Sequence, residues 1–338
     1  MGAAAARVAV RPARVTFDAR SARSPRHSGW ERYARGLLDG LLQQGDADLL
    51  ITPAGTGQSI AGRLWDSYTV LPQQGRRADL CHFPTFPPVG WERGPMVYTL
   101  HDLTWWRDPA AASRLGRHLY RGQAERALRR AHILTPSESV AAEVRAEFGV
   151  PDDRVTAVRN AVALPPPEPP RRRPTRPYLL TVGTVEPRKN LRRLAAAWQR
   201  SGLATTHDLR LVGRQGWGDL PDGMRADIID DDAHLAWLYR NAVATVMVST
   251  YEGFGFPAAE SLSQGTPVIA SDIPALHEAT LGCAVFVDPC DVDAIAAGLH
   301  AVADQPPVVP PAISGAITAH TWRDVAAAVA DLYRRVLG

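Results

Sequence analysis

Short apolar runs recur along the chain, separated by segments whose apolar residues repeat at three- and four-residue spacing. Apolar runs without polar alternation are typical of strands buried on both faces of a parallel sheet. In the first half the predicted strands are residues 14–19, Leu49–Thr52, Tyr68–Leu71, Leu80–Phe83, Met96–Leu100, Ile133–Thr135 and Arg154–Val158. In the second half they are Tyr178–Val182, Leu209–Val212, Ala244–Val248, Pro267–Ala270 and Ala284–Val287.

Helices are predicted between these strands, where the apolar spacing follows a helical period. They begin after Gly29 and span 111–131 and Ser137–Glu147 in the first half; in the second they begin at Asn190 and Pro257 and lie near His234–Asn241, Pro274–Glu278 and Val292–Val302. Strands that alternate with helices in this way predict an α/β fold with two doubly wound, Rossmann-like parallel-sheet domains.

A Pro- and Arg-rich stretch at residues 164–177 divides the chain near its middle. Proline lacks the N–H donor that a helix interior or a central strand needs, so this stretch is predicted to be a stiff linker. The length of 338 residues also exceeds what one hydrophobic core usually supports. We therefore predict an N-terminal domain of residues 1–163 and a C-terminal domain of residues 178–320.

A last helix is predicted at residues 321–338. Thr321 and Asp324 have the spacing of a capping box, and the apolar residues after them lie on one face. The preceding segment, Gln305–Ala312, is rich in proline and is predicted to be a connector. We expect the terminal helix to pack across both domains.

The composition is that of an ordinary globular protein, with 45% apolar and 22% charged residues. The chain has no run of 18 apolar residues, and its first residues lack the apolar core of a signal peptide. Three cysteines, Cys81, Cys283 and Cys290, lack metal-ligand spacing and fit a reducing compartment. These features predict a cytoplasmic protein.

Charge is distributed unevenly. Residues 1–163 have 22 basic and 16 acidic side chains, whereas residues 178–338 have 12 and 18. The arginine-rich helix at 111–131 adds to the basic character of the first half. This asymmetry fits a peripheral contact with the inner face of a membrane, but an ordinary solvated surface explains it equally well. We expect no nucleic-acid partner.

Lys189 is the only lysine in a chain with 38 basic residues, the others being arginine. It follows Arg188 in the segment Val182–Leu191, just before a predicted helix. Arginine offers a planar fork and lysine a compact charge, so the pair suits a phosphate group. An isolated surface lysine is the alternative.

The segment Tyr251–Glu260 follows a predicted strand and leads into a helix. Gly253 and Gly255 leave backbone amides accessible there, and amides at a helix start form an anion site. Glu252 and Glu260 lie on either side of this start. Because carboxylates accept hydrogen bonds, their natural partners are sugar hydroxyls rather than phosphate.

Other candidates have weaker signals. His101 follows a predicted strand, at the sheet edge where ligands of α/β proteins gather, although a single histidine is more often structural. Trp105 and Trp106 could stack on an acceptor near the loop Pro84–Arg93 or belong to the core. Asp230–Asp232 imitates a metal motif, but helix capping explains these aspartates without a metal. The glycines at 213, 216 and 218 do not have dinucleotide-binding spacing.

With these motifs in view, the chain resembles the retaining, nucleotide-sugar-dependent glycosyltransferases of group 1, family four, which include many bacterial mannosyltransferases. The matching motifs are Ser28-Gly29…Arg32-Tyr33, His101-Asp102, Thr135-Pro-Ser137, Gly183–Asn190 and Glu252-x₇-Glu260. The resemblance implies a GT-B architecture, in which the two domains face an interdomain cleft. Val248 and Ala161 depart from the family pattern, where Pro and Gly are common.

The resemblance also implies roles for single residues. Arg188 and Lys189 would hold the donor diphosphate, Glu260 the ribose, and Glu252 the donor sugar together with amides of Gly253, Phe254 and Gly255. His101 would reach the transferred sugar from the first domain. The remaining residues implied are Gly29, Gly183 and Thr184 for the donor, and Arg32, Tyr33 and Trp105 for the acceptor.

The implied activity is transfer of a mannose- or glucose-like hexose from a GDP- or UDP-sugar to an acceptor hydroxyl, with retention and without a metal or bound cofactor. Acceptors could be carbohydrates, lipid-linked sugars or small molecules, in polysaccharide, glycolipid or natural-product biosynthesis. A sugar phosphorylase, a nucleotide-sugar epimerase or a non-catalytic sensor on the same scaffold is the alternative.

Overall fold

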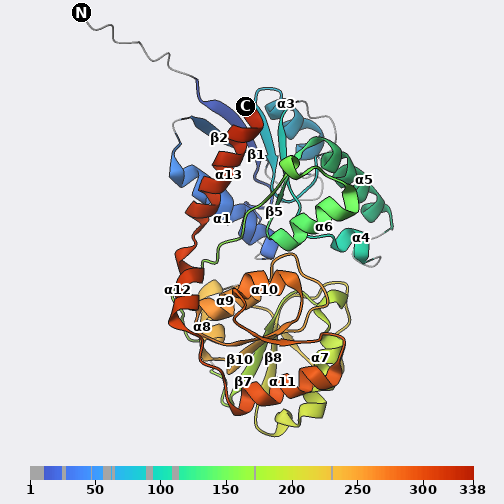
Figure 1. Ribbon diagram of the computed structural model, residues 1–338, viewed down its shortest axis with the longest axis vertical. Helices are drawn as coiled ribbons and strands as arrows, with labels where there is room; N and C mark the ends of the chain where they lie inside the picture. The colour runs from blue at the N-terminus through green and yellow to red at the C-terminus, as the bar shows by residue number, and fades with distance from the viewer. Residues whose placement is uncertain are drawn as a thin grey trace, which may run out of the picture.

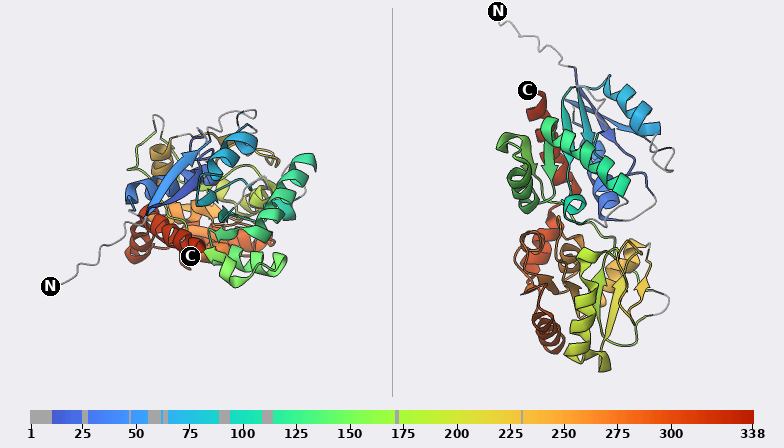
Figure 2. Two further views of the ribbon diagram at one scale, coloured as in Figure 1. Left: turned by 90° about the horizontal axis from the view of Figure 1, so that it is seen from above. Right: turned by 90° about the vertical axis from the view of Figure 1, so that its right-hand side faces the viewer.

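The computed structural model of the protein contains two parallel sheets, one in each half of the chain (Figure 1). The structure describes residues 11–24, 28–46, 48–55, 62, 65–88, 94–108, 114–170, 173–229 and 231–338. Each sheet has six strands in the described residues, and helices cover both of its faces. The two domains lie end to end, which is clearest in the side view of Figure 2.

The N-terminal sheet has the strand order β2-β1-β3-β4-β5-β6, with every neighbouring pair parallel. Its strands are β1 (Ala13–Asp18), β2 (Leu49–Ala54), β3 (Leu80–Phe83), β4 (Met96–Thr99), β5 (His132–Thr135) and β6 (Val155–Ala157). The central strands β3 and β4 are buried along their whole length, as their mainly apolar sequences predict.

Helices enclose this sheet on both faces. They are α1 (Gly29–Gln44), α3 (Leu71–Gly75), α4 (Thr104–Arg107), α5 (Arg114–Arg130) and α6 (Glu138–Phe148). Ser137 caps α6 by accepting a hydrogen bond from the Val140 amide, which fixes where that helix begins. Helix α5 confirms the arginine-rich helix; residues 111–113, where it was expected to start, lie outside the described part of the chain.

The C-terminal sheet has the order β12-β11-β10-β7-β8-β9, again with parallel neighbours. Its strands are β7 (Tyr178–Val182), β8 (Asp208–Val212), β9 (Ala226–Asp227), β10 (Ala244–Met247), β11 (Val268–Ser271) and β12 (Val285–Val287). The chain order reverses where β7 and β10 lie side by side. Ligands of doubly wound sheets bind at the carboxyl ends of such neighbouring strands.

The helices of the C-terminal domain pack in two layers against this sheet. They are α7 (Leu191–Ser201), α8 (Asp232–Asn241), α9 (Phe256–Ser263), α10 (Pro274–Thr280), α11 (Val292–Asp304) and α12 (Pro311–Ala319). Helices α7 and α11 share one apolar core under the sheet, and α9 and α10 share another on its opposite face.

The chain returns to the N-terminal domain at its end. Helix α12 packs against α9, whereas α13 (Trp322–Leu337) lies along α1, as the red helix of Figure 1 shows. Thr321 and Asp324 form the capping box that the sequence predicts. Tyr333 of α13 lies 2.6 Å from the Nδ1 atom of His82, which is fully buried in β3. The last helix is therefore part of the N-terminal core.

Two predicted elements were wrong. Residues 68–71 are not a strand, because a π-helical turn at Asp66–Val70 runs directly into α3. A short apolar run does not distinguish a strand from a helix, and here Tyr68 is 54% exposed. The predicted connector Gln305–Ala312 ends earlier than expected, since α12 begins at Pro311, where proline is well tolerated.

Among the described residues, each helix is either too short or too polar to cross a lipid bilayer.

Buried neutral histidines make the stability of the fold depend on pH. Burial lowers the pKa of His82 from 6.5 to about 3, and that of His101 from 6.5 to about 4. Between pH 6.5 and these values the unfolded chain binds protons that the folded chain does not, so acidification favours unfolding.

We predict that the free energy of unfolding falls as the pH decreases from 6.5 to 5, by up to ~1.4 kcal/mol per pH unit for each of the two histidines. Urea unfolding at pH 5, 6, 7 and 8 measures this slope. The variant His82→Gln should unfold with a shallower pH dependence. An unchanged slope in that variant would contradict the assignment.

Candidate active site

Two loops meet at the carboxyl ends of the neighbouring strands β7 and β10. The first contains Gly183, Thr184 and a 3₁₀ turn at Pro187–Lys189, and the second runs from Val248 to Gly255. Asn190 ties them together, because its side-chain amide donates to the carbonyl oxygen of Val248 at 2.9 Å. The sheet topology thus brings both predicted donor motifs to one place.

Glu252 lies between the two predicted cations. Its Oε2 atom accepts a hydrogen bond from Arg188 Nη1 at 2.7 Å, and its Oε1 atom accepts one from Lys189 Nζ at 2.7 Å. Arg188 also donates through Nε to Glu186, again at 2.7 Å. One buried carboxylate therefore holds both cations.

The electrostatics of this cluster follow from its burial. Burial disfavours the charge on Glu252, but the adjacent Arg188 and Lys189 outweigh that effect and lower its pKa from 4.5 to about 2. Burial also acts to lower the pKa of Arg188, yet Glu252 and Glu186 raise it above its ordinary value. The charges on Glu252 and Arg188 are therefore present at neutral pH.

Gly183 makes room for the lysine. Its backbone has a φ of 152°, and a Cβ atom added there would lie 3.0 Å from Lys189 Cε. Gly183, Thr184 and Lys189 line the same small hollow beside β7. A side chain at position 183 would displace the ammonium group from its present place.

Glu260 lies on α9 and is 3% exposed. Its Oε2 atom accepts a hydrogen bond from the hydroxyl of Tyr239 at 2.8 Å, and its Oε1 atom accepts one from Arg32. Arg32 comes from α1 of the N-terminal domain and also pairs with Asp232 at 2.5 Å. The expected ribose-binding carboxylate is thus occupied by an arginine from across the domain boundary.

His101 follows β4, and its side chain packs among residues of the N-terminal domain. Its Nε2 atom lies 2.7 Å from the carbonyl oxygen of Pro84, and its ring stacks on Trp30 with centroids 5.8 Å apart. The edge of Tyr33 packs against the same ring at 4.7 Å. Since burial lowers its pKa to about 4, the His101 imidazole is neutral at pH 7.

The glycine-rich loop touches the His101 segment directly. A Cβ atom added to Gly253 would lie 1.9 Å from the carbonyl oxygen of His101, so only glycine permits this approach. The Gly253 carbonyl in turn accepts a hydrogen bond from Ser137 Oγ at 2.6 Å. Phe254 is buried against Phe256, whose ring lies beside Gly29. The predicted donor residues of the two domains are therefore in contact.

The expected acceptor residues lie in different surroundings. Tyr33 is 1% exposed, and its hydroxyl shares a hydrogen bond with the hydroxyl of Thr99. The Arg32 side chain instead pairs with Glu260 of the C-terminal domain. Trp105 stacks on Tyr120 with centroids 4.3 Å apart, and Trp106 packs into the core. Residues 89–93 of the loop Pro84–Arg93 lie outside the described residues.

The two competing motifs have structural roles. Asp231 caps α8 by accepting from the Ala233 amide, and Asp232 pairs with Arg32; Asp230 lies outside the described residues. The glycine cluster at 213–218 packs against the loop 183–186, and Val185 forms a bridge with Gln215. Neither motif needs a metal or a dinucleotide to explain it.

Several residues at the site had no sequence signal of their own. Tyr239 and Tyr251 were indistinguishable from core aromatics, and Trp30 from a surface residue. Glu278 of α10 accepts hydrogen bonds from the amides of Glu138 and Ser139, both at 2.7 Å, and so joins the domains at the start of α6. Tyr251 and Glu278 become recognisable only when the two domains are placed together, whereas Tyr239 and Trp30 become recognisable once each domain is folded.

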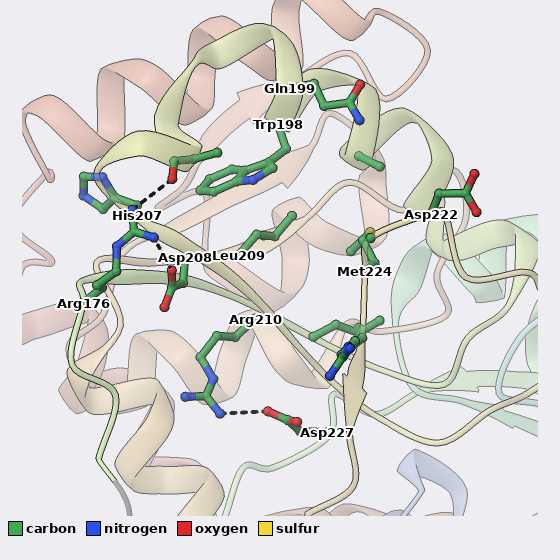
Figure 3. Close-up of a pocket in the computed structure, with 15 residues that line it drawn as sticks. Arg176, Trp198, Gln199, His207, Asp208, Leu209, Arg210, Asp222, Met224 and Asp227 are labelled. Atoms are coloured by element: carbon green, nitrogen blue, oxygen red, sulfur yellow. Dashed lines mark hydrogen bonds and ion pairs between the residues drawn. The ribbon is translucent and has the colours of Figure 1, made fainter.

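A larger hollow of about 520 Å³ lies elsewhere, between α7 and the edge of the C-terminal sheet (Figure 3). Trp198 and Met224 form part of its wall. Two ion pairs lie on its wall, Arg210 with Asp227 at 2.7 Å and Arg176 with Asp208 at 3.0 Å. None of the candidate site residues lines it.

Sequence comparison identifies two families along the chain. Residues 27–164 match the family described as Glycosyltransferase Family 4, and residues 176–305 match the family described as Glycosyl transferases group 1. The O-antigen chain mannosyltransferase B of Escherichia coli is 35% identical over 188 residues, which cover 49% of this chain and 49% of that protein. The match thus spans about half the length of this relative.

Solved structures share the whole fold. Sucrose-phosphate synthase from Thermosynechococcus elongatus has a TM-score of 0.71 at 19% identity, covering 96% of this chain and 99% of that one. Anabaena Alr3699/HepE in complex with UDP and glucose has a TM-score of 0.67 at 13% identity, covering 96% and 100%. Together with the two family matches, this likeness confirms the resemblance: the chain belongs to the group 1, family 4 glycosyltransferases and has the GT-B fold.

Proposed function

We propose that the protein transfers a hexose, with retention, from a nucleoside-diphosphate sugar to an acceptor hydroxyl. The observation that carries this proposal is the shared contact of Glu252 with Arg188 and Lys189, next to Gly253, which packs against the backbone of His101. A carboxylate beside two cations provides what a sugar diphosphate needs, namely an acceptor for hydroxyls next to donors for phosphate.

In this proposal, the charged side chains of the site exchange their present partners for groups of the donor when it binds. Sugar hydroxyls replace Arg188 and Lys189 on Glu252, and the released cations bind the diphosphate. Ribose hydroxyls replace Arg32 on Glu260, while the Tyr239 hydroxyl keeps its place on the other carboxylate oxygen. Each buried charge keeps a partner throughout, which avoids the cost of an isolated charge.

The chemical step rests on the leaving group. Arg188 and Lys189 stabilise the charge that develops on the departing diphosphate, as preorganised donors do in other transfer reactions. The neutral His101 positions the sugar by hydrogen bonding and does not act as a general acid at pH 7. In a same-face reaction the leaving phosphate itself takes the acceptor proton, so the mechanism needs neither a protein nucleophile nor a metal.

The relatives guide the choice of substrates to test. A mannosyltransferase among them favours a GDP-mannose-like donor and a carbohydrate acceptor, and the UDP complex of Alr3699/HepE adds UDP-sugars. We place the reaction in the cytoplasm. The basic helix α5 is the surface through which the N-terminal domain would approach a membrane-bound acceptor.

The assay that tests this function gives purified protein GDP-, UDP-, ADP- and dTDP-sugars with a panel of glycoside acceptors. Release of nucleoside diphosphate together with a product whose anomeric configuration matches the donor supports the proposal. Epimerised donor without acceptor identifies an isomerase, and phosphate-dependent cleavage of a glycoside identifies a phosphorylase. Donor binding without turnover on any acceptor identifies a sensor.

We predict that Lys189→Ala lowers turnover at least ~10²-fold, because it removes a donor that stabilises the leaving diphosphate. Steady-state rates at saturating donor measure the loss. Arg192→Ala is the matched control, since Arg192 is a nearby cation with a 79% exposed side chain paired to Asp219, and it should change the rate less than about twofold. Near-normal turnover in Lys189→Ala would remove this lysine from the mechanism.

A second prediction follows from the exchange of partners. Glu252→Gln removes the negative charge that holds Arg188 and Lys189, so the variant should bind free nucleoside diphosphate about tenfold more tightly. The same variant should transfer sugar more slowly, because it loses the carboxylate that accepts the sugar hydroxyls. Calorimetric titration and turnover measure the two effects.

The control for this charge change is Asp219→Asn, which neutralises an exposed carboxylate on the same domain. It should leave both quantities almost unchanged. Weaker diphosphate binding in Glu252→Gln would mean that Glu252 holds the two cations in place for the ligand. That result would contradict the proposed exchange of partners.

A further inference from the structure

Tyr251 crosses the boundary between the two domains. It precedes Glu252 in the C-terminal domain, and its hydroxyl accepts a hydrogen bond from the backbone amide of Leu103 in the N-terminal domain at 2.8 Å. The same hydroxyl donates to Glu143 Oε2 of α6, also at 2.8 Å. The phenol group thus contacts two separate segments of the opposite domain.

The ring of Tyr251 is held as firmly as its hydroxyl. The guanidinium carbon of Arg107 lies 4.4 Å from the ring centroid, in cation–π contact. Arg107 is itself fixed by Glu147 at 2.7 Å and by Glu143 at 3.4 Å. The tyrosine side chain therefore contacts residues of both α4 and α6.

The two residues of the Tyr251–Leu103 contact each lie next to residues of the candidate active site. On one side, the Tyr251 carbonyl accepts a hydrogen bond from Arg188 Nη1 at 3.2 Å, and Glu252 follows directly. On the other side, Leu103 lies two residues after His101, whose carbonyl touches Gly253. The segments 251–253 and 101–103 are thus joined by a polar bond at one end and close packing at the other.

We propose that Tyr251 is a positioning residue, which sets the placement of His101 relative to Glu252 when the domains are closed. This inference rests on the proposed transfer reaction. The Tyr251 hydroxyl bonds to Leu103 and Glu143 of the N-terminal domain, whereas the proposed ribose carboxylate, Glu260, bonds to Tyr239 and Arg32, so we expect the hydroxyl to act on the geometry of the transferred sugar rather than on nucleotide binding. Small misplacements of this kind are costly to a reaction that depends on orientation.

The kinetic test is Tyr251→Phe, which keeps the ring and its contact with Arg107. We expect kcat to fall about tenfold while the dissociation constant of the nucleotide sugar changes less than twofold. Tyr239→Phe is the matched control, because its hydroxyl bonds to Glu260 within one domain. That variant should weaken donor binding. Equal losses of affinity in both variants would overturn the positioning role.

Two further measurements keep the inference separate from the proposed function. Hydrogen exchange at the Leu103 amide should accelerate in Tyr251→Phe, whether or not the protein transfers sugars; unchanged exchange would refute the contact itself. Glu143→Gln retains an oxygen that accepts from Tyr251, so its kcat should stay near the wild-type value. A wild-type protein inactive on the whole substrate panel, with faster Leu103 exchange in the variant, would refute only the proposed function.

Discussion

The pairing of one buried carboxylate, Glu252, with two cations is the interaction on which the rest of the site depends. A buried charge is stable only with partners, and Arg188 and Lys189 supply them from the loop after β7. The pairing also fixes two loops that leave neighbouring strands at the point where the sheet order reverses. Because each of these side chains has a partner, a ligand that enters must offer hydrogen-bond donors for the carboxylate and negative charge for the two cations, and the hydroxyls and phosphates of a sugar diphosphate do so.

Hydrogen bonds between the two domains follow the same principle, because each gives a polar group of one domain a partner from the other. Arg32 completes the hydrogen bonding of Glu260, Tyr251 that of the Leu103 amide, and Glu278 that of the first amides of α6. These bonds hold the two domains together in the arrangement that the structure shows. The contacts differ in what they mean for donor binding. The Arg32 bond occupies the carboxylate proposed to bind the ribose, whereas the Tyr251 and Glu278 bonds lie beside the proposed donor site.

Much of this architecture could be predicted from local sequence. The uninterrupted apolar strands give two parallel sheets, and the loops after Val182 and Val248 must then end at the same edge of one sheet, which brings Lys189 and Glu252 together. The run Tyr68–Leu71 shows the limit of such patterns, because so short a run suits a strand or a helical turn equally. Arg32 on Glu260 and Tyr251 on Leu103 could not be predicted, since both contacts depend on how two separately folded domains meet.

The central claim is that Lys189 leaves Glu252 for the donor diphosphate, and the composition of the chain allows a direct measurement. Since Lys189 is the only lysine, protein labelled with ¹³C-lysine gives a single set of side-chain NMR signals. Titration with a nucleoside-diphosphate sugar should shift the Cε signal and saturate at the concentration that stabilises the protein against heat. Thermal stabilisation without any change in that signal would contradict the account.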